Sequence, residues 1–371
     1  MRIAFTAPMK PLDDPVPSGD RTMGRLLVRA LELAGHEVRI ATRFRSWSRE
    51  GGVSRQNRIE ADAREEARRI GDDWAREGYR PDGFLTYHLY HKAPDWIGPA
   101  LADRFATAYA VVEASRAPKR RTGEWAHGFA AADMALARAD RVAALHRADH
   151  ECLADVVPQD RLQLLAPFLD AAPFLDMPHQ RAAPRAPLRL LAVGMMREGA
   201  KLASYQVLAE ALRGLDRTTY HLTIAGDGPC RDDVVSLMRG LPVTLAGEVA
   251  ASDMARLYAA HDLLVWPAVR EAFGFVFLEA QAAGLGVVGG ATFGVPDIVA
   301  EGKSALLSPE GDAPALAANL SRLLADPVRV STMGEAARAH IRARHTLDAG
   351  ATRLDAFLHG ALRHHASTAR Q

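Results

Sequence analysis

The chain has 371 residues, of which 48% are hydrophobic and 25% are charged. A single hydrophobic core stops growing at roughly 250–300 residues, so we expect two domains. The composition is that of a globular protein and argues against disorder. The formal net charge of +1 provides no strong field for attracting DNA or RNA, so nucleic acid is not an expected partner.

The cysteines and the N-terminal residues indicate in which cellular compartment the protein is expected. Cys152 and Cys230 are far apart in the sequence and form no disulfide framework, which is typical of a reducing environment. The first apolar run ends at Pro8, which is short for a signal peptide, and no segment approaches the ~20 apolar residues of a membrane span. We therefore expect a cytoplasmic protein, with contact at the inner face of a membrane left open.

Short apolar runs alternate with amphipathic stretches in the first half of the chain. Apolar residues at i, i+3 and i+4 predict a helix over residues 21–34, ended by Gly35. A long pattern rich in Arg and Glu predicts a second helix over 57–77. Strands are predicted at residues 3–6, 38–41, 84–87, 109–112, 141–145 and 162–166. This alternation favours a parallel sheet covered on both faces.

A proline-rich stretch without a clear period, residues 167–187, divides the chain. Proline removes backbone donors and breaks helices, so we predict an N-terminal domain over 1–170 and a linker over 171–187. A second αβ series then follows over 188–345, with a final helix over 346–371 that can return to the first domain. Its strands are predicted at residues 188–193, 222–225, 243–246, 263–266, 286–288 and 305–307. We expect two Rossmann-like domains facing a cleft, with ligands at the carboxyl ends of the strands.

The most informative segment runs from Glu271 to Gly284 and follows a predicted strand. A glycine at a helix start permits close approach, and free N–H groups there suit a phosphate; these groups belong to Gly274, Phe275 and Val276. Glu279, about one turn into the helix, can accept hydrogen bonds from two hydroxyls, as acidic residues do with ribose. The alternative is a surface helix with two solvated glutamates.

This segment resembles the E-x7-E signature of the family-4 retaining glycosyltransferases of GT-B fold. Its surroundings are similar to the family in order: Ser18-Gly-Asp-Arg21, Ala139-Asp-Arg-Val142, Ala225-Gly-Asp-Gly-Pro229, Gly294-Val-Pro-Asp-Ile-Val299 and Pro309-Glu-Gly-Asp312. The resemblance covers most of the chain and is strongest over 188–312. It implies transfer of a sugar from a UDP- or GDP-linked donor to an acceptor hydroxyl, with retention of configuration. The donor is expected in the C-terminal domain and the acceptor mainly in the N-terminal domain.

The resemblance also implies roles for single residues. Glu279 would hold the ribose, Glu271 would contact the donor sugar, and the backbone near Gly274 and Phe275 would bind the distal phosphate. The predicted donor site further includes Gly19, Gly194, Gly226, Phe273 and Val276. Gly19 fits a close approach to the ligand, and it also fits a helix start capped by Ser18 or Asp20.

Two basic residues, Arg197 and Lys201, follow the first predicted strand of the second domain. Cations there would stabilise the charge that builds on a departing nucleoside diphosphate. The family's arginine usually follows the glycine directly, where this chain has Met195. The alternative interpretation is that Arg197 and Lys201 lie on an ordinary solvated loop. The family needs no metal, because basic side chains and a helix start take the metal's electrostatic role, and no cofactor is expected.

The N-terminal domain departs further from the family pattern. Many relatives carry a histidine after the strand at 109–112, where this chain has Glu113. That carboxylate could contact the sugar as a catalytic residue or could pair with Arg116. His88 and His91 are expected on the acceptor side. Their spacing superficially suggests a metal pair, but no nearby Cys or well-spaced acidic set completes a site, so cleft or structural histidines are favoured over metal ligands.

An arginine-rich run precedes the helix predicted over 57–77. With interleaved aromatic residues it could meet an anionic lipid or acceptor, although a solvated loop is favoured; its arginines are Arg43, Arg45, Arg49, Arg55 and Arg58. The acceptor is expected to be a glycan, a lipid-linked molecule or a small molecule. Two other functions stay open: an epimerase or phosphorylase on the same fold, and a non-catalytic protein that binds sugar nucleotides. The oligomeric state is not readable.

Overall fold

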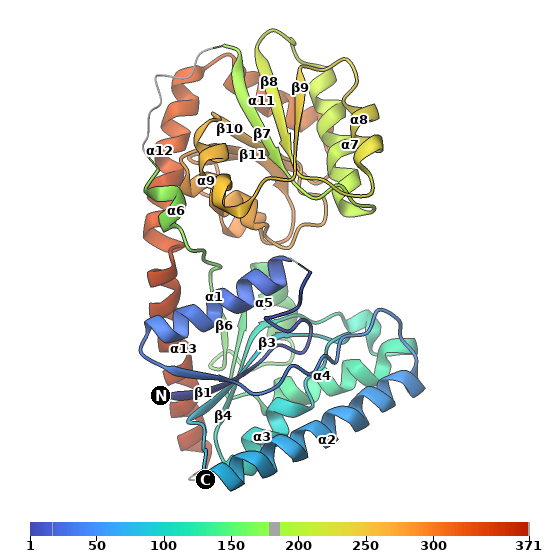
Figure 1. Cartoon of the computed structure of the whole chain (residues 1–371), viewed down its shortest axis with the longest axis vertical. Coiled ribbons are helices and arrows are strands. Elements are labelled where there is room, and N and C mark those ends of the chain that lie inside the picture. The colour runs from blue at the N-terminus through green and yellow to red at the C-terminus, as the bar shows by residue number, and fades with distance from the viewer. Residues whose placement is uncertain (17, 178–185, 370–371) are drawn as a thin grey trace. The chain divides into compact units, whose positions relative to one another are not determined.

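The computed structural model describes residues 1–16, 18–177 and 186–369 (Figure 1). The chain divides into two compact units. The first consists of Met1–Ala166 together with Leu347–Gln371, and the second consists of Pro167–Thr346. They are called the N-terminal and C-terminal domains below, and each is described by itself.

The N-terminal domain is built on a six-stranded parallel sheet in the order β2-β1-β3-β4-β5-β6. Every strand predicted for this half of the sequence is present, although the last one is shorter than expected. The strands are β1 (Arg2–Thr6), β2 (Glu37–Ile40), β3 (Gly83–Leu89), β4 (Ala108–Ala114), β5 (Arg141–Ala144) and β6 (Leu162–Leu164). The central strands β3 and β4 are almost wholly buried, as expected for a parallel sheet covered on both faces.

Helices cover both faces of this sheet. Helices α2 (Val53–Glu77), α3 (Ile97–Phe105) and α4 (Ala126–Arg138) lie on one face, and α1 (Gly19–Leu33) packs against α13 (Leu347–Thr368) on the other (Figure 1). Helix α5 (Arg147–Ala154) lies beside β5 and β6. The core between the sheet and the α2–α4 layer is rich in aromatic side chains, among them Trp74, Phe84 and Tyr109.

Helix α2 begins at Val53, four residues before the predicted start. The first turn contains Gln56, which is only 3% exposed. Its Oε1 accepts from the Gly128 N–H at 2.6 Å, and its Nε2 donates to the Glu124 carbonyl. A polar residue buried by such long-range hydrogen bonds does not add to an apolar period, so the sequence pattern missed this turn.

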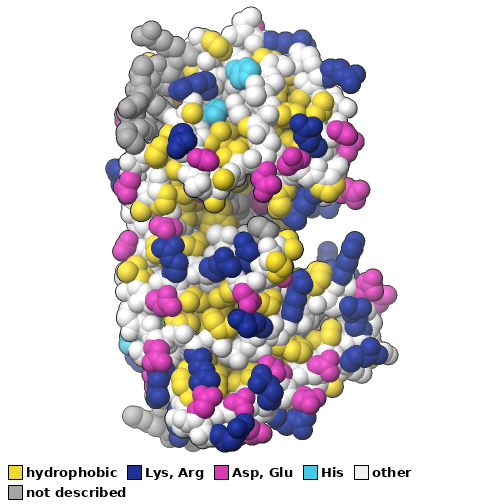
Figure 2. Space-filling view, in the orientation of Figure 1, with side chains coloured by type: hydrophobic (Ala, Val, Ile, Leu, Met, Phe, Trp, Pro, Cys, Tyr) yellow, Lys and Arg dark blue, Asp and Glu magenta, His cyan; other side chains and the backbone are white. Residues whose placement is uncertain are grey.

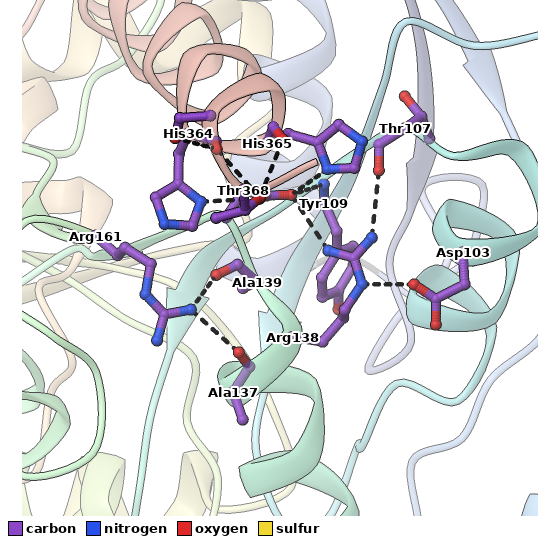
Figure 3. A network of polar contacts seen from close by, with 12 residues as sticks. Asp103, Thr107, Tyr109, Ala137, Arg138, Ala139, Arg161, His364, His365 and Thr368 are labelled. Atoms are coloured by element: carbon purple, nitrogen blue, oxygen red, sulfur yellow. Dashed lines mark hydrogen bonds and ion pairs between the residues drawn. The ribbon is translucent and has the colours of Figure 1, made fainter. Parts of the chain in front are cut away.

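The last helix, α13, is fixed to the N-terminal domain by a polar network around Asp140 (Figure 3). The Asp140 side chain is 4% exposed. Its carboxylate accepts from the Tyr109 N–H at 2.9 Å and from Arg138 at 3.2 Å, and it pairs with His364 Nδ1 at 2.9 Å and His365 Nδ1 at 3.4 Å. The C-terminal end of the chain is therefore part of the N-terminal domain.

The C-terminal domain contains a second six-stranded parallel sheet, in the order β12-β11-β10-β7-β8-β9. This is the 3-2-1-4-5-6 order of dinucleotide-binding domains, with the strand order reversing between β7 and β10. Each strand predicted for this half is present: β7 (Leu188–Val193), β8 (Tyr220–Ala225), β9 (Val243–Gly247), β10 (Leu263–Trp266), β11 (Gly286–Ala291) and β12 (Ala305–Pro309).

Seven further helices of four residues or more belong to the described part of the C-terminal domain. One layer contains α7 (Ala200–Arg213), α8 (Arg231–Leu237) and α11 (Ala313–Leu324), which contact one another in the order α8, α7 and α11. The other contains α6 (Ala172–Leu175), α9 (Ala251–Ala259), α10 (Phe275–Ala282) and α12 (Pro327–Arg344). The sheet is thus covered on both faces, as in the first domain.

The domain boundary differs from the predicted one by a few residues. Residues 167–170 were expected in the first domain but belong to the second. The reason is a pair of contacts with the end of α12: the Leu169 N–H donates to the His345 carbonyl at 2.9 Å, and His345 Nδ1 lies 2.7 Å from the Pro167 carbonyl. The linker predicted over 171–187 includes α6, and its residues 178–185 lie outside the described part of the chain.

Charges of both signs are interspersed over the face seen in Figure 2, in keeping with the net charge of +1. Among the described residues, no helix combines the length and apolar character needed to cross a bilayer.

Candidate functional site

The carboxyl ends of β7 and β10 form the switch point of the C-terminal domain, where ligands bind in such sheets. The loop after β7 leads into α7, which carries Lys201 in its first turn. The loop after β10 carries Glu271 and leads into α10. Two segments 70 residues apart are thereby brought to one place.

Lys201 and Glu271 form an ion pair at this point, through Lys201 Nζ and Glu271 Oε2. The ammonium group also lies 5.3 Å from the centre of the Trp266 ring, and Trp266 Nε1 lies 3.5 Å from the same carboxylate oxygen. The two charged side chains are 16% and 19% exposed. Two residues predicted separately for the donor site are therefore in contact, and Trp266 is a neighbour that the sequence reasoning missed.

Two predicted glycines, Gly194 and Gly226, approach each other closely, and Gly194 also lies against the Trp266 ring. Gly226 has a φ of 137°, and a Cβ added to it would lie 2.0 Å from the Gly194 carbonyl oxygen. A Cβ on Gly194 would lie 2.8 Å from the Trp266 ring. The Gly194 carbonyl also accepts from the Tyr205 hydroxyl at 2.6 Å. The close approach of two loops requires glycine at both positions.

Gly226→Ala is expected to lower the free energy of unfolding by about 2–6 kcal/mol, the sum of backbone strain and forced overpacking. Urea unfolding followed by circular dichroism measures this. The matched control is Gly214→Ala, because Gly214 has a φ of −82° and its added Cβ would meet only the Ala211 carbonyl at 3.8 Å. An equal, small effect of both substitutions would contradict the close approach.

Helix α10 begins at the segment singled out in the sequence. Gly274 is its N-cap residue, with a φ of 72° and no side chain to cap the helix. The first N–H groups of a helix have no partner within it, so those of Phe275 and Val276 are available to a ligand. Phe273 is buried, and its ring packs edge-on against that of Phe275 at 5.3 Å. This start of α10 has the properties of an anion site.

The loop before α10 is held by contacts that the sequence reasoning did not assign. Glu310 accepts from the Arg270 N–H at 3.0 Å and from the Thr292 hydroxyl at 3.2 Å. The Val269 N–H donates to the buried Ser204 hydroxyl at 3.0 Å. Ala268 and Arg270 both have positive φ values, 57° and 50°, a strain that surrounding contacts must sustain. The loop that carries Glu271 is therefore well positioned.

Glu279 lies at the middle of α10 and accepts from the Tyr258 hydroxyl at 2.8 Å. Burial raises the pKa of the Glu279 carboxyl, and the hydrogen bond from Tyr258 offsets only part of that shift. One carboxylate oxygen is thus oriented by the protein. Tyr258, on α9, lies 21 residues away in the sequence and gave no signal of its own there.

Arg197, also predicted for the donor site, does not contact the Lys201–Glu271 pair. It is exposed in the loop between β7 and α7, and none of the hydrogen bonds or ion pairs among the described residues involves its side chain. Met196, next to it, is buried and anchors the loop through a bond from its N–H to the Asp227 carbonyl at 2.9 Å. A free guanidinium on an anchored loop can still reach a phosphate.

The N-terminal domain gathers a second group at its own switch point, between β1 and β3. Ser18 caps α1 by accepting from the Arg21 N–H at 3.2 Å, which places Gly19 as the first helical residue. The Asp20 carboxylate then lies 3.1 Å from His88 Nδ1 at the end of β3. Glu113, at the end of β4, lies 3.9 Å from the same nitrogen.

This group corrects an expectation from the sequence, in which no acidic set lay near His88. Asp20 and Glu113 are distant along the chain, and the parallel crossovers bring both to it. Burial alone would raise the pKa of Asp20, but His88 lowers it overall. Burial alone would lower the pKa of His88, but Glu113 and Asp20 raise it overall. Burial raises the pKa of Glu113 against the opposing charge of His88.

Arg116 and His91, which the sequence placed near this group, have partners of their own. Arg116 makes a two-pronged bond to Asp133, with both distances 2.9 Å, so it is not the partner of Glu113. His91 does not join His88; its ring packs edge-on against Trp125 at 5.5 Å. Burial, together with nearby positive charges, lowers the pKa of His91 to about 4, which makes it a neutral side chain near pH 7.

A cavity of about 670 Å³ lies at the carboxyl ends of β1 and β2 in the N-terminal domain. Its walls combine apolar residues, Phe5, Leu12 and Phe44 among them, with Arg43 and Arg69. The sequence reasoning did not find it.

The predicted arginine-rich loop borders this cavity and is ordered by side-chain contacts. Arg43 pairs with Asp13 at 2.5 Å, and Arg45 donates to the Met9 carbonyl at 2.9 Å and stacks on Trp47. Arg55 lies 3.8 Å from Glu50. Arg49 precedes α2, whereas Arg55 and Arg58 both lie within this helix, so the favoured loop ends before Val53.

Comparison with known proteins finds one matching family model and two relatives that are described here. Residues 187–326 match the family model described as glycosyl transferases group 1. A D-inositol 3-phosphate glycosyltransferase of Mycolicibacterium gilvum is 30% identical over 312 residues, which is 74% of this chain and 66% of that protein. The sulfoquinovosyl transferase SQD2 of Arabidopsis thaliana is 35% identical over 120 residues, 32% of this chain and 24% of that protein. The chain thus spans about a quarter of the length of the plant relative.

Among solved structures, the HepE protein of Anabaena in complex with UDP-glucose is similar, with a TM-score of 0.68 at 15% identity. The similarity covers 97% of this chain and 99% of that one. At this identity the likeness shows the fold alone. The predicted α/β fold of GT-B type, with two Rossmann-like domains, is confirmed.

Proposed function

We propose that this chain, which carries a glycosyl transferases group 1 domain within a GT-B fold, transfers a sugar from a nucleotide-diphosphate sugar to an acceptor hydroxyl. The observation that carries the proposal is the contact of Lys201 with Glu271 and Trp266 at the start of α10. A cation, a carboxylate and a free helix N-terminus are the groups needed around a sugar diphosphate. Retention of configuration and membership of family 4 belong to this proposal and rest on the E-x7-E resemblance.

The diphosphate is the leaving group, and negative charge builds on it as the glycosidic bond breaks. Lys201 provides a point charge, Arg197 a free guanidinium, and α10 the N–H groups of Phe275 and Val276. These groups stabilise the transition state more than the ground state. They leave no need for a metal at the diphosphate, and the departing phosphate can itself take the acceptor proton.

In this proposal, Glu279 contacts the ribose end of the donor and Glu271 contacts the sugar end. Glu279 keeps one oxygen on Tyr258 and offers its remaining acceptor capacity to the two ribose hydroxyls. Glu271, held by Lys201, accepts from hydroxyls of the transferred sugar. A UDP-linked donor has the support of the HepE complex with UDP-glucose, and a GDP-linked donor stays open.

The acceptor is proposed to bind in the N-terminal domain, near His88, Glu113 and the cavity beside β1 and β2. That cavity has apolar walls and paired charges, which suits a small molecule, a glycan or the head of a lipid-linked acceptor. The expected place of action remains the cytoplasm, including the inner face of a membrane if the acceptor carries a lipid.

Nucleotide binding tests the donor site directly. Calorimetry with UDP, GDP and ADP is expected to show binding of one diphosphate by the wild type. Glu279→Ala is expected to weaken it at least tenfold, because about 1.4 kcal/mol or more is lost when two charge-assisted hydrogen bonds are removed.

Glu335→Ala is the matched control, since Glu335 is an exposed residue of α12 that makes none of these contacts. Folded wild type that binds none of the three nucleotides would refute the donor site. Binding without turnover on any acceptor would favour a non-catalytic role, and conversion of the donor with no acceptor present would favour an epimerase.

A further inference from the structure

We propose that Asp20, His88 and Glu113 bind a divalent transition-metal ion in the N-terminal domain. One ligand atom of each side chain lies within 4.8 Å of the others. His88 Nδ1 is 3.1 Å from Asp20 Oδ1 and 3.9 Å from Glu113 Oε1. Metal bonds of about 2.0–2.2 Å place neighbouring ligand atoms roughly 3.0–3.5 Å apart, so a small movement of the Glu113 side chain completes the set.

A second observation points to a ligand at the same place. Glu113 is only 9% exposed, and its Oε2 has no hydrogen-bond partner among the described residues. A buried carboxylate oxygen without a partner is costly. A cation held by Glu113, His88 and Asp20 would compensate this buried carboxylate, which also has the Tyr87 hydroxyl as a neighbour.

The backbone holds two of the three ligands in place. Tyr87 pairs with Val112 and Leu89 with Ala114, so His88 and Glu113 occupy opposite positions on neighbouring strands. Both have positive φ values, 63° and 61°. Such strain persists only where the surrounding structure maintains it. The third ligand, Asp20, lies in the first turn of α1 behind the Ser18 cap, which fixes its position too.

The ligand types indicate which ions suit the group. One imidazole nitrogen and two carboxylate oxygens favour Mn²⁺, Co²⁺ or Zn²⁺ over Mg²⁺ and Ca²⁺, which prefer oxygen alone. Three protein ligands leave coordination positions open to water or to a substrate oxygen. The proposal does not depend on the donor groups assigned to the C-terminal domain, Lys201, Glu271 and Glu279 among them.

Metal binding is measured on the full chain without an affinity tag, after treatment with EDTA and dialysis. Titration with Zn²⁺ by calorimetry, and with Co²⁺ by visible absorption, is expected to show one tight site per chain. Glu113→Gln and Asp20→Asn, which keep the side-chain shape, are each expected to weaken that site at least tenfold. Bound Zn²⁺ is also expected to raise the thermal midpoint of the wild type and not that of the variants.

The matched control is His91→Asn, three residues from His88 but outside the group, and its metal affinity is expected to equal that of the wild type. Circular dichroism verifies that each variant is folded. The proposal is overturned if the folded wild type binds neither ion, or if Glu113→Gln and Asp20→Asn bind as the wild type does. Loss of transfer activity alone, with metal binding intact, would count against the proposed function and not against the metal site.

Discussion

Replacing Lys201 with alanine is expected to lower kcat and kcat/KM together by about 100–1000-fold, the usual loss when one group that stabilises a developing negative charge is removed. The Lys201 ammonium is held in one place by Glu271 and by the Trp266 ring, so its position needs little reorganisation during reaction. Its removal would also leave the Glu271 carboxylate without its ion-pair partner. Steady-state kinetics with the donor identified by calorimetry measures the effect.

Two further variants test this role: one removes a lysine elsewhere in the domain, and one keeps the charge at position 201. Lys303→Ala removes an exposed lysine of the same domain and is expected to leave the kinetics unchanged. Lys201→Arg keeps the charge but changes the geometry around Glu271 and Trp266, and should recover only part of the rate. A rise in KM with unchanged kcat in Lys201→Ala would mean that the lysine serves binding alone, and the assigned role would be wrong.

Replacing Asp140 with alanine is expected to lower the free energy of unfolding by about 3–5 kcal/mol, the cost of breaking a buried charge network by removing one member. The Tyr109 N–H and the charged nitrogen of Arg138 would lose their acceptor, and α13 would lose the bonds of His364 and His365 (Figure 3). The expected result is a lower urea midpoint and early release of the C-terminal helix. Circular dichroism and limited proteolysis followed by mass spectrometry measure the two effects.

Asp72→Ala provides the comparison for this prediction. Asp72 accepts from Arg104 at 2.7 Å, but its side chain is 65% exposed. An exposed pair contributes about 0–1 kcal/mol, so this variant should be nearly as stable as the wild type. Similar unfolding curves for Asp140→Ala and Asp72→Ala would show that the network does not hold α13.

The strands and the acidic segment were predictable because their signals are local. An apolar run such as residues 263–266 is buried on both sides wherever a parallel sheet forms, so it needs no knowledge of its partners. The start of α10 could also be predicted, because Gly274 lies between a predicted strand and an apolar helical segment. The early turn of α2 was not, because Gln56 is buried by bonds to residues about 70 positions away.

The two αβ domains, the glycines where loops approach closely and the residue types suited to a sugar diphosphate could all be predicted from the sequence. The side chains that meet could be identified only from the folded chain. Lys201 reaches Glu271 across 70 residues, and Asp20 reaches His88 across 68. The physical reason is that each parallel crossover returns the chain to the same edge of its sheet. Residues that follow different strands therefore converge there, and no spacing along the chain records the distance between them.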